Sequence, residues 1–144
     1  MTITFHKYEG AGNDFVLLDG RGPLPELSPD FVALLCHRRL GIGADGLMVV
    51  ENATGYDFRM RYFNADGYEG TMCGNGGRCI TLYAHLLGIG GAVKHFIACD
   101  GEHTAEILSG DGTAGRVRLQ MADPTPITTY ANGLLLNTGS PHYV

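Results

Sequence analysis

The sequence of 144 residues contains no tryptophan and no apolar run that approaches the ~20 residues of a membrane-spanning helix. Its ten lysines and arginines are scattered and the formal net charge is −5, so the chain has no basic stripe that would neutralise nucleic-acid phosphates. The first residues alternate like a strand and lack the layout of a signal peptide. These absences argue against membrane and nucleic-acid partners and predict a cytoplasmic protein.

Cysteine is also scarce, with four residues at positions 36, 73, 79 and 99. Nothing marks the chain as secreted, so free thiols are the expected state. Cys73 and Cys79 have neither a C-x-x-C pattern nor a histidine at zinc spacing. Six residues of helix also rise about 9 Å, which prevents the two sulfurs from facing one small ligand. The sequence therefore argues against a metal site.

Glycine, by contrast, is abundant with 22 residues, which indicates many tight turns in a strand-rich fold. We expect strands at residues 3–5, 15–18, 47–50, 56–62, 93–99, 103–108 and 116–121, and a glycine-rich loop without regular structure at 9–14. A packing helix is expected to begin at Ser28-Pro29-Asp30 and to end near Gly41.

Two lengths of chain are expected to differ in organisation. Residues 1–122 are predicted to form one β-rich lobe round a single buried helix. Residues 123–144 are predicted to contain a linker at 123–126, new structure from 134–136 and a polar turn at 137–142, as the first part of a truncated second lobe.

The most informative stretch is Met72-Cys-Gly-Asn-Gly-Gly-Arg-Cys79 with the apolar residues that follow it. Apolar side chains on nearly every side of a helical wheel predict a buried helix that stops at Gly88. Its first turn holds three glycines, although each costs roughly 1 kcal/mol against alanine. Bare amides at a helix N-terminus can bind an anion, and the same field favours the thiolate of Cys73. The pattern indicates an activated sulfur beside an anion-binding turn.

On the residues alone, three interpretations of Cys73 compete: an inert cysteine in a glycine-rich turn, a metal ligand, and a thiolate that removes a proton next to a carboxylate. In the third, the amides of Gly74 and Asn75 would meet the charge that moves onto the carboxylate. Inversion of that carbon would need a second acid on the opposite face. Asn13 and Asn64 are either turn residues or amides presented to a ligand.

Five stretches resemble the diaminopimelate epimerase family and occur in the family's order: GAGNDF at 10–15, GIGADG at 41–46, FNADG at 63–67, MCGNGGRC at 72–79 and TGSPH at 138–142. The resemblance implies an enzyme that needs no cofactor and interconverts LL- and meso-2,6-diaminopimelate in lysine and cell-wall precursor synthesis. It also implies an α+β fold of two similar lobes, each with mostly antiparallel strands wrapped round a central helix, and an active site between the lobes.

The resemblance also implies a role for each matching residue. Cys73 would be one of two cysteines that exchange the α-proton, and Gly74 and Asn75 would hold the reacting carboxylate. Substrate polar groups would be bound by Asn13, Asn64 and Ser140. His142 matches a histidine that tunes the protonation of the cysteine pair.

Three departures from the family pattern are visible. Gly46 stands where some members have a substrate-contacting glutamine, and Ser140 replaces a common asparagine, keeping only a short hydroxyl. Family members are also roughly double this length, and their second catalytic cysteine lies in the second lobe. No cysteine follows Cys99, which falls in a predicted hairpin without an anion-binding turn. The chain alone is therefore predicted to be inactive.

Two other functions remain open at this point. One is a different racemase of the same fold that acts on proline or hydroxyproline, although such enzymes usually have histidine where Asn75 stands. The other is a non-catalytic lobe that binds an amino acid. A single lobe would also expose an apolar cleft face, which favours pairing with a second copy as a homodimer.

Overall fold

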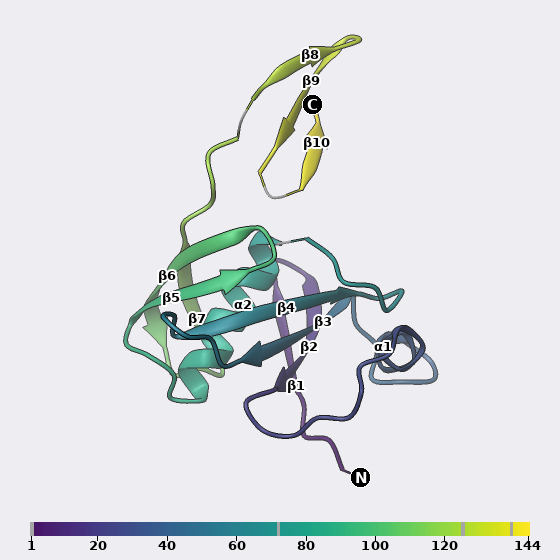
Figure 1. Cartoon of the computed structure of the whole chain (residues 1–144), viewed down its shortest axis with the longest axis vertical. Helices are drawn as coiled ribbons and strands as arrows, with labels where there is room; N and C mark the ends of the chain where they lie inside the picture. Colours follow the sequence, from purple (N-terminus) through teal and green to yellow (C-terminus); the bar gives the residue numbers. More distant parts are fainter. Residues whose placement is uncertain (1, 72, 125, 139) are drawn as a thin grey trace.

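The computed structural model describes residues 2–71, 73–124, 126–138 and 140–144 (Figure 1). Over these residues a seven-stranded sheet wraps round helix α2 (Gly74–Leu86), and a three-stranded sheet stands apart from it. The larger sheet has the order β1-β2-β3-β4-β5-β6-β7, with parallel pairs only at β2–β3 and β4–β5. The predicted α+β class, mostly antiparallel strands round a central buried helix, is confirmed.

Strands β1 (His6–Gly10) and β2 (Asn13–Asp19) form a tight hairpin. Its two-residue turn places Ala11 at φ 54° and Gly12 at φ 86°, the left-handed pair that matches the twist of a hairpin. The predicted strand at residues 3–5 and the predicted irregular loop at 9–14 are therefore wrong. Glycine in this stretch permits the turn rather than preventing the strands on either side of it.

Helix α1 (Pro29–Cys36) begins as the sequence predicts, because the Ser28 hydroxyl accepts a hydrogen bond from the Phe31 N–H at 3.3 Å. It ends five residues earlier than expected, at Cys36, and His37 already has extended backbone angles. Gly41 instead lies against α1, where a Cβ atom would be only 1.9 Å from the Leu34 carbonyl oxygen. Cys36, in the last turn of α1, is buried in the core.

Strands β3 (Gly46–Glu51) and β4 (Phe58–Asn64) pair in antiparallel fashion at the centre of the sheet. The strand predicted at residues 56–62 is confirmed over residues 58–62 of β4, with Phe58 and Met60 buried on the α2 side. Strands β5 (Val93–Ala98) and β6 (Gly101–Gly110) form the predicted hairpin, and β7 (Gly115–Leu119) continues it.

Helix α2 is the core of this sheet. Ile80, Tyr83 and Ala84 are 0–2% exposed and pack among side chains from β1 to β6. The helix ends at Leu86, and Gly88 follows at φ 72°, so the predicted stop is confirmed. A second cluster packs α1 against the opposite face of β2 and β3. The sheet thus holds the N-terminus of α2 near the point where β2 and β3 begin and β4 ends.

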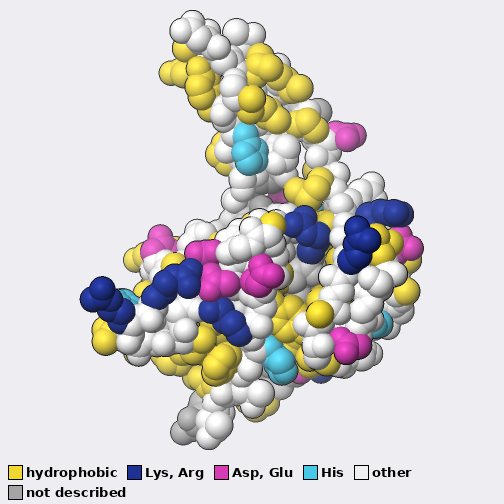
Figure 2. Space-filling view, turned by 180° about the vertical axis from the view of Figure 1, so that it is seen from behind, with side chains coloured by type: hydrophobic (Ala, Val, Ile, Leu, Met, Phe, Trp, Pro, Cys, Tyr) yellow, Lys and Arg dark blue, Asp and Glu magenta, His cyan; other side chains and the backbone are white. Residues whose placement is uncertain are grey.

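The smaller sheet consists of β8 (Thr128–Tyr130), β9 (Gly133–Asn137) and β10 (Pro141–Tyr143) in the order β10-β9-β8. The new structure at residues 134–136 is confirmed, whereas the polar turn predicted at 137–142 includes the start of β10. Apolar side chains, yellow in Figure 2, gather on this sheet. The exposed apolar residues of the three strands include Tyr130, Leu134, Leu135 and Tyr143.

None of the helices in the described ranges is long and apolar enough to cross a membrane.

Candidate active site

Cys73 is the N-cap residue of α2. Its backbone is extended, at φ −115° and ψ 129°, and its carbonyl accepts the first helical hydrogen bond from the Gly77 N–H at 2.7 Å. The half-buried side chain makes no capping hydrogen bond and packs against the core. The N–H groups of the first helical turn lack intrahelical acceptors, so they point past Cys73 as donors. The predicted placement of the thiol at a helix N-terminus is confirmed.

Packing explains one of the glycines in that turn. A Cβ atom at Gly76 would lie 3.1 Å from the Met48 sulfur and 3.6 Å from the Cys73 Cβ. Gly74, in contrast, has only ordinary contacts, the nearest 3.6 Å away at the Met121 sulfur. A side chain at position 76 would thus crowd Met48 where α2 packs on β3, whereas one at position 74 would make only ordinary contacts.

Asn13 and Asn75 meet next to this sulfur although they are 62 residues apart in the chain. The Asn75 side-chain amide donates to Asn13 Oδ1 at 3.2 Å, and the Cys73 sulfur lies 3.8 Å from the same oxygen. Asn75 Oδ1 in turn accepts from Arg78, one turn along the helix. The structure therefore joins three of the predicted site residues in one polar group and adds Arg78, which the sequence analysis missed.

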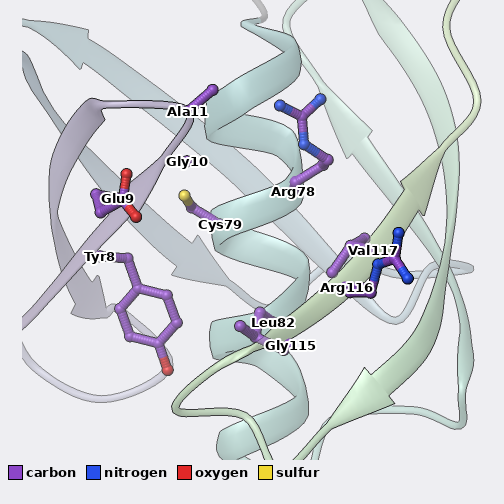
Figure 3. A pocket seen from close by; sticks show the side chains of 10 residues that line it. All are labelled: Tyr8, Glu9, Gly10, Ala11, Arg78, Cys79, Leu82, Gly115, Arg116 and Val117. Atoms are coloured by element: carbon purple, nitrogen blue, oxygen red, sulfur yellow. The ribbon is translucent and has the colours of Figure 1, made fainter.

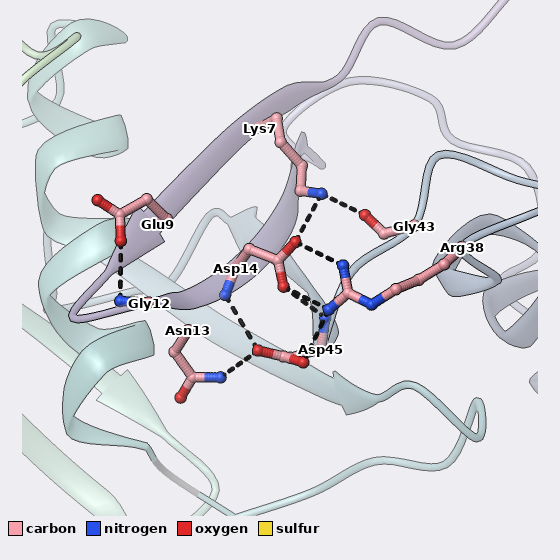
Figure 4. A network of polar contacts seen from close by, with 8 residues as sticks. All are labelled: Lys7, Glu9, Gly12, Asn13, Asp14, Arg38, Gly43 and Asp45. Carbon is pink, nitrogen blue, oxygen red and sulfur yellow. Dashed lines mark hydrogen bonds and ion pairs between the residues drawn. The ribbon is translucent and has the colours of Figure 1, made fainter.

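A cluster of charged residues lies next to Asn13, where β2 and β3 begin (Figure 4). Asn13 Nδ2 donates to Asp45 at 2.7 Å, and Arg38 donates to both Asp14 and Asp45 at 2.9 Å. Lys7 forms a further ion pair with Asp14 at 2.9 Å. Hydrogen bonds from Arg38, followed by those from Lys7, hold the pKa of Asp14 well below its usual range. This cluster is not predicted from the sequence, although Asp14 and Asp45 each fall in a glycine-rich motif.

Asn64 is exposed at the end of β4, on the same face of the strand as Tyr62. Gly70 lies directly against both side chains, since a Cβ there would be 2.7 Å from Asn64 Nδ2 and 2.8 Å from the Tyr62 ring. No hydrogen bond joins Asn64 to Cys73, Asn13 or Asn75 within the described residues. The structure thus places Asn64 beside Tyr62 at the end of β4 but does not link it to the amide group.

Ser140 lies directly before β10 of the smaller sheet. Its hydroxyl lies 2.7 Å from that of Thr71, two residues before Cys73. His142 is exposed on β10, and its Nε2 lies 3.1 Å from the Thr138 hydroxyl, so the imidazole contacts Thr138 rather than the Cys73 sulfur. Met72 and Gly139, which belong to the motifs of these two segments, lie outside the described residues.

The other thiols face different surroundings. Cys79 is buried, and burial raises its pKa to about 12. It borders a cavity of about 360 Å³ between β1 and β7, with Arg78 and Arg116 at its rim (Figure 3). Burial likewise raises the pKa of Cys36 to about 11. Cys99 is exposed at the β5–β6 turn, with its sulfur 3.5 Å from the Gly70 carbonyl oxygen. Among these cysteines, Cys73 is the one that combines partial exposure with a helix N-terminus.

The described residues hold no group of three histidine, cysteine or acidic side chains placed to bind a metal ion.

A helix-capping cysteine with uncrowded amides and a paired asparagine suits proton transfer next to a carboxylate. The family model of diaminopimelate epimerase matches residues 5–126. The chain belongs to the diaminopimelate epimerase family. The resemblance seen in the five sequence stretches is confirmed.

Relatives named diaminopimelate epimerase match nearly the whole chain. That of Flavobacterium psychrophilum is 45% identical over 99% of this chain and 54% of its own length. That of Chlorobaculum tepidum is 44% identical over 94% of this chain and 54% of its own. The chain thus spans about half the length of these relatives. Among solved structures, a probable proline racemase from Agrobacterium radiobacter K84 superposes with a TM-score of 0.78 at 16% identity, covering 99% of this chain and 51% of that one, which shows a shared fold.

Proposed function

We propose that this chain is the first lobe of a diaminopimelate epimerase and that Cys73 is one of its two acid–base residues. The observation that carries the proposal is the position of Cys73 at the N-cap of α2, with its sulfur 3.8 Å from the side-chain oxygen Oδ1 of Asn13. The family match supports the choice of diaminopimelate as substrate. The match to only 54% of each relative supports the view that half of the site lies elsewhere.

In the proposed reaction, the Cys73 thiolate takes the α-proton of the substrate, so that an S–H bond forms as the C–H bond breaks. The electron pair left on carbon spreads onto the carboxylate. Backbone N–H groups of Gly74 and Asn75 stabilise this charge, because the free amides and the positive end of α2 point at the same place. A second acid, supplied by the other lobe, returns a proton to the opposite face and inverts the centre.

The remaining residues are proposed to bind the substrate, to hold the two parts of the chain together or to adjust the protonation of the cysteine pair. Asn13 and Asn64 would contact polar groups of the substrate from β2 and β4. Ser140 would hold the segment of the second lobe against the loop before Cys73, as its 2.7 Å contact with Thr71 suggests. His142 follows on β10 and would tune the protonation of the cysteine pair once the complete second lobe is present.

The division of the chain is also part of the proposal. Residues 1–122 would form the first lobe, and residues 123–144 would form the linker and the beginning of the second. The apolar side chains exposed on β8–β10 would then pack under the remainder of that lobe. Alternatively, a second copy of the chain would pack against these apolar side chains, in which case the protein would be a homodimer. The cytoplasm stays the proposed compartment, although two Oryza sativa relatives are named chloroplastic.

The test uses the longer protein of which this chain is proposed to be the first lobe. The protein is incubated in D₂O with LL-diaminopimelate, and both the meso product and α-deuterium are measured. We expect Cys73→Ala to abolish both signals and Cys79→Ala, six residues further along α2, to keep them. Binding of the substrate without deuterium uptake by the unsubstituted protein would instead identify a binding lobe and contradict the proposal.

A further inference from the structure

The side chain of Asn13 could present either of two chemically opposite ends to the site. Its amide has a carbonyl oxygen, which only accepts hydrogen bonds, and an NH₂ group, which only donates them. Rotation of the terminal amide by half a turn exchanges the two with little change of shape. Something outside the side chain must therefore decide which end lies next to the Cys73 sulfur.

Asp45 is the group that makes this choice. Its Oδ2 atom lies 2.7 Å from Asn13 Nδ2, and a carboxylate can only accept. The NH₂ group must therefore face Asp45 and the carbonyl oxygen must face the sulfur. The opposite side agrees, because the Arg78 guanidinium donates to Asn75 Oδ1 and leaves Asn75 Nδ2 to donate to Asn13 Oδ1. The carboxylate of Asp45 thus fixes the orientation of the Asn13 amide, and the guanidinium of Arg78 fixes that of the Asn75 amide.

The carboxylate of Asp45 is itself held in place. The Asp14 N–H donates to Asp45 Oδ2 at 3.2 Å, and the Asp45 N–H donates to Asp14 Oδ1 at 3.1 Å. Arg38 lies between the two carboxylates and donates to each of them at 2.9 Å. This reciprocal pair ties the end of β2 to the residue before β3, so Asp45 is fixed to the rigid sheet rather than to a loop.

We propose that Asp45 is a positioning residue that orients the Asn13 amide with its carbonyl oxygen towards Cys73. The catalytic consequence rests on the proposed function. Asn13 then offers only an acceptor to a ligand, so it selects a group with an N–H, such as an ammonium, and disfavours a carboxylate at that position. Loss of Asp45 would remove the acceptor that holds the NH₂ group, so the amide could turn over and place a donor where the N–H group of the substrate is expected.

The first test uses this chain and needs no turnover. The side-chain NH₂ signals of Asn13 are recorded by ¹H–¹⁵N NMR and assigned by their disappearance in Asn13→Asp. We expect one of the two proton shifts to lie well downfield of its usual position in the unsubstituted chain, because that proton is held by the Asp45 carboxylate at 2.7 Å. Asp45→Ala should return this shift to the usual range, while Asp45→Asn, which keeps an acceptor of the same shape, should retain most of the displacement.

The matched control is Asp19→Ala, which removes an acidic side chain from the other end of β2, where its partner is Arg21. Circular dichroism confirms that each variant is folded. Asn13 signals that are the same in Asp45→Ala as in Asp19→Ala would overturn the positioning role, whether or not the protein is an epimerase.

The second test measures the catalytic consequence in the longer protein. Asp45→Ala should lower kcat about three- to tenfold, the effect of one hydrogen bond at a partly exposed site. Asp45→Asn should recover most of this loss, and Asp19→Ala should leave kcat and KM unchanged. A kcat for Asp45→Ala equal to that of Asp19→Ala would overturn the inference, whereas inactivity of the unsubstituted protein would refute the proposed function alone.

Discussion

Tyr62 fills the space that a side chain at Gly46 would need. A Cβ atom at Gly46 would lie 2.6 Å from the Tyr62 ring, 3.0 Å from its hydroxyl and 2.7 Å from the Phe63 carbonyl oxygen. Gly70 borders the other edge of the ring, so two glycines form a slot that holds Tyr62 beside the site. Burial, with a smaller contribution from Cys73, raises the pKa of Tyr62 to about 12. The small residue at position 46 is therefore matched by a large neighbour.

This relationship predicts that Gly46→Ala lowers the free energy of unfolding by about 1–3 kcal/mol, because the new methyl group must displace the ring or the backbone. Urea unfolding measures the change. The matched control is Gly22→Ala, where nothing lies within 4 Å of the added atom and a change within about 0.5 kcal/mol is expected. Equal stability of the two variants would show that Tyr62 does not fill the slot.

The contact between Thr71 and Ser140 predicts a measurable coupling between the two parts of the chain. Thr71→Val and Ser140→Ala should each weaken it, and the double variant should cost about 0.5–1 kcal/mol less than the sum of the two. The measurement is a double-mutant cycle on the free energy of unfolding. Strict additivity would mean that the 2.7 Å contact between the hydroxyls contributes nothing in solution.

The surroundings of the four cysteines predict an order of alkylation. Cys99 is exposed and Cys73 half-buried, whereas Cys36 and Cys79 are 3% and 4% exposed. Brief treatment with iodoacetamide near pH 8 should modify Cys99 and Cys73 and spare the other two. Peptide mass mapping reads the pattern, and all four should react in urea. Modification of Cys79 as fast as Cys99 would contradict the packing of α2.

The raised pKa of the buried thiols predicts loss of stability in alkali. Between about pH 9.0 and pH 12 the Cys79 thiol ionises in the unfolded chain but stays protonated in the folded one. The unfolded state therefore releases more protons, and stability that is complete below pH 9 declines as the pH rises. Urea unfolding from pH 7 to 11 tests this, with a shallower decline expected for Cys79→Val. Constant or rising stability across this range would exclude the effect.

The sequence predicts well where the signal is local. The glycines round Cys73 and the stop at Gly88 are enough to define α2, and Ser28 with Pro29 defines the start of α1. It fails at the hairpin of residues 11–12, because Ala11 adopts a left-handed conformation that its identity does not suggest. Glycine-rich composition alone does not distinguish a loop from a two-residue turn.

The site shows the same limit. The residue types at Asn13, Cys73 and Asn75 are visible in the sequence, but their meeting depends on β2 running alongside the N-terminus of α2. The partners Asp45 and Arg38 were missed for the same reason, since the parallel pairing of β2 with β3 decides that the two motifs adjoin. Pairing between distant strands is a tertiary property that spacing along the chain does not encode.

The most direct measurement compares this chain with the longer protein of which it is proposed to be the first lobe. Both are incubated in D₂O with LL-diaminopimelate, and the meso isomer is followed by chiral chromatography. The half-site proposed here predicts meso product from the longer protein and none from the 144-residue chain. Formation of meso product by the chain alone would contradict it, because inversion would then need no acid from a second lobe.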